Sequence, residues 1–136
     1  MNEVRIGRVS GINDTAGTIR VSYSDRTEKD TAELPVFCGM GREYQMPKVG
    51  DQVLVLHLSN DSSMGVAMGG FWTDKTRPQN SGPGVYYKSF QPDNSAYLQA
   101  FQGALSLCAG SLTLQDASGS ISLSEILAMK RKVDTL

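Results

Sequence analysis

The sequence predicts an all-β protein in two parts, a small Greek-key barrel followed by a short trimeric β-helix or β-prism stalk, with a short helix at the carboxyl end. Short runs of alternating apolar and β-branched residues fill the first part of the chain. Charge is unevenly spread: residues 1–88 hold 20 of the 27 charged side chains, residues 89–124 hold two, and the last twelve hold five. The expected segments are a barrel over residues 1–75, a connector over 76–84, an intertwined stalk over 85–124 and a helix over 125–136.

The first predicted element is a β-hairpin. Residues 3–10 and 17–24 both alternate with period two, and the turn formers of residues 13–17 separate them. The expected core-facing residues of the first strand are Val4, Ile6 or Val9, and those expected to face water are Arg5 and Arg8.

Three further strands complete the predicted barrel, over residues 32–38, 53–58 and 64–72. Residues 53–58 are apolar at nearly every position, which predicts a strand buried on both faces. The glycines within residues 64–72 predict a bulge or a sharp bend, as closure of a small barrel requires. Five short strands of this kind favour a Greek-key barrel of the oligonucleotide/oligosaccharide-binding (OB) type.

A short repeat predicts the stalk. An aliphatic, a hydroxyl and an aliphatic residue follow one another at residues 105–107, 112–114 and 121–123, and a glycine precedes each copy. Stacked copies present one aliphatic face. The six residues expected on it are Leu105, Leu107, Leu112, Leu114, Ile121 and Leu123.

This aliphatic face is too small to support the segment alone. Burial of six side chains does not offset the conformational entropy lost when 36 residues become ordered, and a narrow sheet leaves its edges unpaired. We therefore expect other copies of the chain to complete the core around a symmetry axis, with three-fold symmetry the usual one for narrow β-prisms. The alternative is a sheet that packs on its own barrel.

The carboxyl end predicts a short helix. Ser122 and Glu125 have the spacing of a capping box, and basic residues fill the last turn. Ile126, Met129 and Val133 lie on one stripe of such a helix.

No constellation of residues indicates an enzyme. The one histidine, His57, lies in the middle of a predicted strand without a nucleophile elbow, which favours a structural role. The two cysteines, Cys38 and Cys108, are 70 residues apart in apolar surroundings, which predicts reduced and buried thiols. Neither a metal-ligand spacing nor a phosphate-binding glycine loop is present, so we expect no cofactor and no metal site within one chain.

Composition bears on the expected partners and location. A net charge of −1 gives no positive field for a phosphate backbone, so nucleic acid is not an expected partner. The longest apolar run is far shorter than a membrane-spanning helix, and we expect no stable membrane insertion. The amino terminus resembles no secretory signal, so synthesis is expected to end in the cytoplasm.

Residues 44–56 have the sequence Tyr-Gln-Met-Pro-Lys-Val-Gly-Asp-Gln-Val-Leu-Val-Leu, and the glycine-rich residues 65–72 end in Phe-Trp. Together these two segments resemble the phage baseplate assembly protein V family, which contains central tail spikes. In order of parts the resemblance covers residues 3–125, and its specific portion is 46–72. The residues of this motif expected to determine the barrel's geometry are Pro47, Val49, Gly50, Asp51, Gly65, Gly69 and Gly70.

The resemblance implies a function. Similar spikes occur in type VI secretion and in tailocin particles, and they imply a homotrimer that plugs a tail tube, organises the baseplate hub and helps puncture a target envelope. The implied partners are hub and tail-tube proteins, and the implied location is a virion tail or an extracellular injection particle. An OB-type module for nucleic acid or oligosaccharide remains the alternative function.

The chain departs from the family pattern at its carboxyl end. Many of these spikes carry a long stalk and a His-x-His iron tip, whereas this chain has about three repeat copies and one histidine. We therefore expect either a separate tip protein or a blunt end closed by the terminal helix. Whether several chains together hold a metal at the apex stays open, as does the choice between virus, bacteriocin and injection apparatus.

Overall fold

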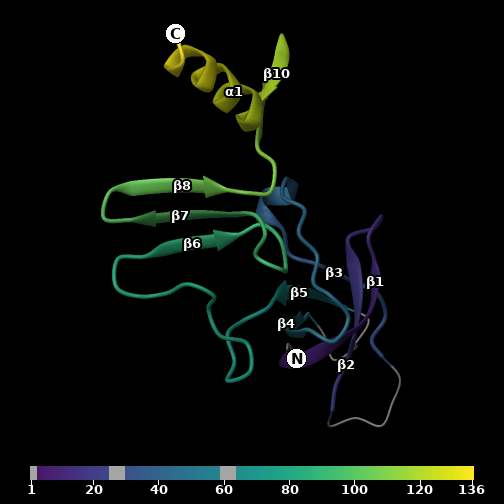
Figure 1. The fold of residues 1–136 in the computed structure, drawn as a ribbon. Coiled ribbons are helices and arrows are strands. Elements are labelled where there is room, and N and C mark those ends of the chain that lie inside the picture. Colours follow the sequence, from purple (N-terminus) through teal and green to yellow (C-terminus); the bar gives the residue numbers. More distant parts are fainter. Residues whose placement is uncertain (1–2, 25–29, 59–63) are drawn as a thin grey trace. The chain divides into compact units, whose positions relative to one another are not determined.

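The computed structural model describes residues 3–24, 30–58 and 64–136. The chain divides into two compact units, Met1–Thr76 and Arg77–Leu136, and Figure 1 draws the elements of both. Within the described ranges, no helix combines the length and the hydrophobicity needed to cross a bilayer.

The first unit is a nearly closed barrel of five strands in the order β3-β2-β1-β4-β5 (Figure 1). The strands are β1 (Glu3–Asn13), β2 (Thr18–Ser22), β3 (Leu34–Pro35), β4 (Gln52–His57) and β5 (Gly65–Gly69). Long β1 belongs to both halves of the sheet, since its start pairs with β4 and its end pairs with β2. A parallel bridge between Val36 and Ala67 closes the circuit, and the Phe37 N–H donates to the Ala67 oxygen at 2.7 Å. The predicted all-β class, OB-type barrel and first hairpin are confirmed.

Two strands are shorter than predicted. Of residues 32–38 only Leu34 and Pro35 form β3, and β5 ends at Gly69. Gly69 has a φ of +111° and pairs with Leu54, next to an irregularity in the register of β4 and β5. The positive φ of Gly69 ends the regular pairing of β4 with β5. The chain bends at this position, as the glycine-rich segment predicts.

The barrel contains its own hydrophobic core. The buried apolar residues come from all five strands and from the end of the first hairpin, and they are Val9, Ile19, Val21, Tyr23, Leu34, Val53, Val55 and Ala67. Gly7 belongs to the same inner face, because a Cβ there would lie 2.4 Å from Cγ1 of Val21.

The expected facing of β1 is partly wrong. Val9 is buried as expected, but Val4 and Ile6 are 62% and 55% exposed. Arg5 shares the parity of Val9 along the strand and lies over the Tyr23 ring, with its guanidinium carbon 4.3 Å from the ring centroid. A charged residue can thus occupy the inner face at the barrel's end by stacking, and this places its apolar neighbours outside.

The predicted burial of β4 on both faces is also wrong. Val53, Val55 and His57 are buried, while Leu54 and Leu56 are only half-buried. Leu56 pairs with Val4 and Leu54 pairs with Ile6, so these four side chains share the outer face of the barrel. An apolar run alone does not reveal whether a second layer covers it.

The second unit consists of two small sheets and a helix. One sheet is antiparallel, in the order β6-β7-β8, with β6 (Tyr86–Ser89), β7 (Tyr97–Phe101) and β8 (Ala104–Cys108). The other is the hairpin of β9 (Thr113–Asp116) and β10 (Gly119–Ser122). Helix α1 (Leu123–Asp134) follows, and its capping box of Ser122 and Glu125 is confirmed. All of residues 77–136 are described, and none of them is buried.

The repeat does not stack as we expected within one chain. The first copy lies in β8, which pairs with β7, whereas the second and third copies pair with each other as β9 and β10. Each copy thus forms a strand, but the first copy has no ladder to the second. An intertwined stalk made by several chains stays a prediction.

Candidate functional site

The first part of the candidate site is one face of the β6-β7-β8 sheet. Leu105 and Leu107 lie opposite Ala100 and Leu98 of β7, and directly opposed residues of an antiparallel pair share a face. Leu105 is 70% exposed and Leu107 is 53% exposed. On β7 and β8 this face is therefore apolar, and the two leucines of β8 are uncovered in the single chain.

The second part is one face of the β9–β10 hairpin. Leu114 lies opposite Ile121, and the Leu123 N–H donates to the Leu112 oxygen at 2.8 Å, which extends the pairing by one more position. These four side chains share a face because they alternate with the polar residues between them. Leu114 is 60% exposed and Leu123 is 44% exposed, while Leu112 and Ile121 are half-buried.

The six residues predicted to form an interface thus form two clusters, two on β8 and four on the hairpin. We call the six together the stalk stripe: Leu105, Leu107, Leu112, Leu114, Ile121 and Leu123. Exposed aliphatic side chains in a unit without buried residues are typical of a surface that another chain covers. No bond-making chemistry is available to such side chains, so this site is suited to association only.

The barrel motif forms a turn that fixes the start of β4 on β1. The Gly50 N–H donates to the Val9 oxygen at 2.8 Å, and the Val9 N–H donates to the Asp51 oxygen at 2.9 Å. Asp51 also closes the turn, since its carboxylate accepts from the Lys48 N–H at 2.9 Å. Gly50 has a φ of +96°, a conformation that glycine adopts without strain. Pro47 is half-buried and Val49 is 64% exposed.

The glycines of the returning strand differ in their surroundings. Gly65 is buried, and a Cβ there would lie 2.5 Å from the Leu56 oxygen, so the close approach of β5 to β4 requires glycine. Gly70 is exposed and has no such neighbour, since the nearest atom to a Cβ is the Gln52 oxygen at 3.7 Å.

His57 is a core histidine, as we expected. It is 3% exposed, and its Nε2 lies 2.6 Å from the Tyr23 hydroxyl. Its Nδ1 lies 3.2 Å from the Met64 oxygen. Because a carbonyl oxygen only accepts, Nδ1 donates to it, while Nε2 is hydrogen-bonded to the tyrosine hydroxyl. Both ring nitrogens therefore have structural partners.

The expected burial of the cysteines is wrong. Cys38 and Cys108 are both free thiols and both exposed. Cys108 lies opposite Tyr97, and a hydrogen bond between their side chains is the largest cause that raises the pKa of Tyr97 above 10.0. Apolar neighbours in sequence do not imply burial in a narrow sheet, where one face can remain open.

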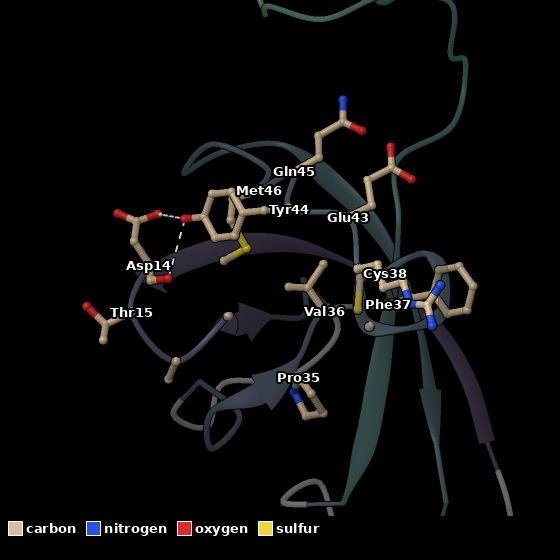
Figure 2. A pocket seen from close by; sticks show the side chains of 14 residues that line it. Asp14, Thr15, Pro35, Val36, Phe37, Cys38, Glu43, Tyr44, Gln45 and Met46 are labelled. Atoms are coloured by element: carbon tan, nitrogen blue, oxygen red, sulfur yellow. Dashed lines mark hydrogen bonds between the residues drawn. The ribbon is translucent and has the colours of Figure 1, made fainter. Parts of the chain in front are cut away.

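Sequence reasoning missed a groove beside the turn between β1 and β2. It has a volume of about 500 Å³ and is lined by the turn and by residues 35–38 and 41–46 (Figure 2). Tyr44 points toward Asp14 and donates to its carboxylate at 3.0 Å. Loss of water around the ring, followed by this hydrogen bond and the charge of Asp14, raises the pKa of Tyr44 above 10.0. The exposed aromatics at Phe37 and Tyr44 are the only signal that the sequence offers for this groove.

Groups of three or more histidine, cysteine, aspartate or glutamate side chains that could hold a metal ion do not occur among the described residues. The groove contains carboxylates and one thiol, but it contains no histidine. Among the described residues, the uncovered stalk stripe and the groove are thus features suited to function.

A comparison with known families finds a match for the barrel. The sequence model of a protein family matches residues 5–72, half of the chain, and the family is described as the type VI secretion system/phage-baseplate injector OB domain. The match spans the five barrel strands and the turn motif. No curated protein matches the chain.

Proposed function

The chain belongs to the type VI secretion system/phage-baseplate injector OB-domain family, a family of structural baseplate proteins, and from this membership we propose that it works as a central spike. In this proposal three identical chains form a rigid body at the distal end of a tail tube. The trimer plugs the tube and helps puncture the target envelope. The proposed work is mechanical and involves no catalysis.

One observation supports the trimer most strongly. The stalk stripe is largely exposed, and none of residues 77–136 is buried. A unit of this kind does not recover its conformational entropy by burying its own side chains. Additional copies that meet along the same stripe supply the missing core, and cyclic symmetry gives each copy the same environment.

The proposed trimer also fits a role that transmits force. Strands that pair across chains leave few free edges, and a stripe shared by three chains resists bending. The other expected partners are the baseplate hub, the tail-tube proteins and a separate tip protein. The proposed particle is a phage tail, a tailocin or an injection apparatus, assembled from chains made in the bacterial cytoplasm.

Light scattering tests the trimer. We expect the wild-type chain to have three times the 14.7 kDa mass of one chain at micromolar concentration. Leu107→Asp should reduce the mass to that of one chain, because it would bury carboxylates close to a symmetry axis. Ser106→Asp is the matched control: Ser106 is the neighbouring residue on the opposite face of β8, and this variant should remain trimeric. A wild-type mass of one chain would refute the proposal.

A second candidate function is an OB-type module that binds an oligosaccharide or single-stranded nucleic acid. The groove favours it, since Phe37 and Tyr44 are 57% and 66% exposed beside it and can stack on sugars or bases. The carboxylates of Asp14 and Glu43 in the same groove oppose phosphates. Salt-dependent retention of single-stranded oligonucleotides, lost in Tyr44→Ala, would support this function in place of the spike.

A further inference from the structure

Helix α1 has an exposed apolar stripe with the spacing of a coiled coil. Ile126, Met129 and Val133 are 37%, 52% and 65% exposed, and Leu136 follows three residues beyond Val133. Within the helix the intervals of three and four residues match the a and d positions of a heptad, with Ile126 and Val133 at a and Met129 at d, while Leu136 lies beyond the helix end. This stripe is suited to packing against another helix.

The single chain does not explain how α1 is stabilised. Every residue of the helix is exposed, and a helix of 12 residues is marginal in water without tertiary contacts. Its start is well fixed, because Ser122 caps it and the Leu123 N–H is bonded to the Leu112 oxygen. The helix therefore continues directly from the hairpin part of the stalk stripe.

Charges beside the stripe favour a parallel arrangement of identical helices. In the heptad, Glu125 has position g and Lys130 has position e, and parallel helices in register bring these two positions of neighbouring copies together. In the antiparallel register that opposes Met129 to Val133, Lys130 would instead face its own counterpart. The capping bonds of Glu125 use Oε1, so Oε2 of the same carboxylate can accept from an ammonium group.

Lys130 can reach a neighbouring helix. Its ammonium group lies 2.8 Å from the Asp134 carboxylate within the helix, and its side chain is 69% exposed. An ammonium group has three donors, so one bond to Asp134 leaves two for a carboxylate of another copy.

We propose that α1 of each copy packs in parallel and in register on α1 of the other copies, through Ile126, Met129 and Val133. The partner of the stripe is thus the same helix of a second copy of this chain. The inference rests on the proposed oligomer, because chains joined through the stalk stripe begin their helices at one end. This tether gives the helices a high local concentration, which offsets their short length. Isoleucine and valine at a positions favour two strands in free peptides, so the stalk, and not the helix, sets the number of copies here.

Disulfide cross-linking of the full-length chain tests the packing. Val133→Cys, in a background of Cys38→Ser and Cys108→Ser, should form disulfide-linked pairs of chains on oxidation, because parallel helices in register bring the residue 133 side chains together. Arg131→Cys is the matched control, since position f faces away from the seam, and it should cross-link much more slowly. Equal rates for the two variants would overturn the proposal.

A charge reversal tests the orientation. Lys130→Glu places two carboxylates side by side in the parallel arrangement, so we expect cross-linking of Val133→Cys to slow by about two- to fivefold. Asp134→Asn removes only the bond within the helix, and it should leave the cross-linking rate unchanged. An equal effect of the two substitutions would overturn the role of Glu125 and Lys130.

The cross-linking results and the mass measurement have separate outcomes. A trimeric mass without preferential cross-linking at residue 133 refutes the helix packing and leaves the spike proposal intact. A mass of one chain for the same background refutes the proposed trimer and the helix packing with it. A trimeric mass with preferential cross-linking at residue 133 supports both.

Discussion

At the scale of single residues, Tyr23 and His57 form a buried polar contact in the barrel. The tyrosine hydroxyl lies 2.6 Å from Nε2 of the histidine, and both side chains are buried. Arg5 covers the tyrosine ring from the inner face of β1. The tyrosine hydroxyl and both ring nitrogens of the histidine thus have partners within the barrel, as buried polar atoms require.

His57→Leu should destabilise the barrel by about 1–3 kcal/mol, because it removes the buried hydrogen bond between the Tyr23 hydroxyl and the histidine ring. Tyr23→Phe removes that hydroxyl, so the same substitution of His57 should cost less in the Tyr23→Phe background. Urea unfolding of the four chains of this double-mutant cycle measures the difference. The same cost in both backgrounds would show that the hydrogen bond contributes nothing.

Gly7→Ala should destabilise the barrel by about 1–3 kcal/mol through overpacking. The added Cβ would lie 2.4 Å from Cγ1 of Val21 and 2.8 Å from the Ser22 oxygen, and the backbone oxygen is not free to move aside. Gly11→Ala on the same strand is the control, since its nearest neighbour would be Cδ of Arg20 at 3.7 Å. Thermal unfolding of both variants checks the contrast, and equal shifts in melting temperature would contradict it.

At the scale of elements, the turn between β9 and β10 depends on the charge of Asp116. The Ser118 hydroxyl, the Ser118 N–H and the Gly119 N–H all donate to Oδ1 of Asp116, at 2.6, 2.8 and 3.2 Å. These bonds, that of the Ser118 side chain first, hold the pKa of Asp116 below its ordinary value of 3.8. The ionised carboxylate thus favours the hairpin conformation.

The hairpin should therefore lose stability at acidic pH. Because the pKa is lower in the folded than in the unfolded chain, the contribution is complete above the unfolded pKa and is lost as the pH falls through the folded pKa. A carboxyl titration followed by NMR should give a pKa for Asp116 below 3.8. In Ser118→Ala the value should rise toward 3.8, and an unchanged value would show that the hydroxyl has no influence.

The elements differ in how well the sequence predicts them. The hairpin of β1 and β2 and the capped helix were predictable, because period two, turn residues and a capping box are local signals. The facing of β1 was not, because the stacking of Arg5 on Tyr23 joins residues of two strands. The pairing of the repeat copies was not predictable either, since three similar segments fit several ladders equally well.

At the scale of the whole molecule, the sequence predicted the division into two units better than it predicted the candidate site. The charge-poor segment marks the unit without a core, and the family match coincides with the unit that has one. The groove beside the first turn was missed because residues 14–17 meet residues 35–38 and 41–46 only in the folded barrel, where β2 pairs with β3 and the Val36 N–H donates to the Gly17 oxygen at 3.0 Å. A local sequence pattern does not predict contacts between segments that are distant in the sequence.

The proposed trimer should tolerate salt. Its contacts along the stalk stripe are apolar, and salt screens exposed charges but does not weaken apolar contacts. Light scattering in 0.1 M and in about 1 M sodium chloride should therefore give the same mass. Dissociation at the higher concentration would instead indicate an assembly held by ion pairs.

The unequal distribution of buried residues also bears on how the protein is made. The barrel holds every buried residue of the described chain, so it can reach its native state in a first-order reaction as soon as it leaves the ribosome. In the trimer that we propose, residues 77–136 would mature only after encounters between chains, at a rate that depends on the rate of synthesis. In chains that have not yet assembled, residues 77–136 would stay sensitive to proteases. Proteolysis would therefore remove unassembled chains and leave assembled particles intact.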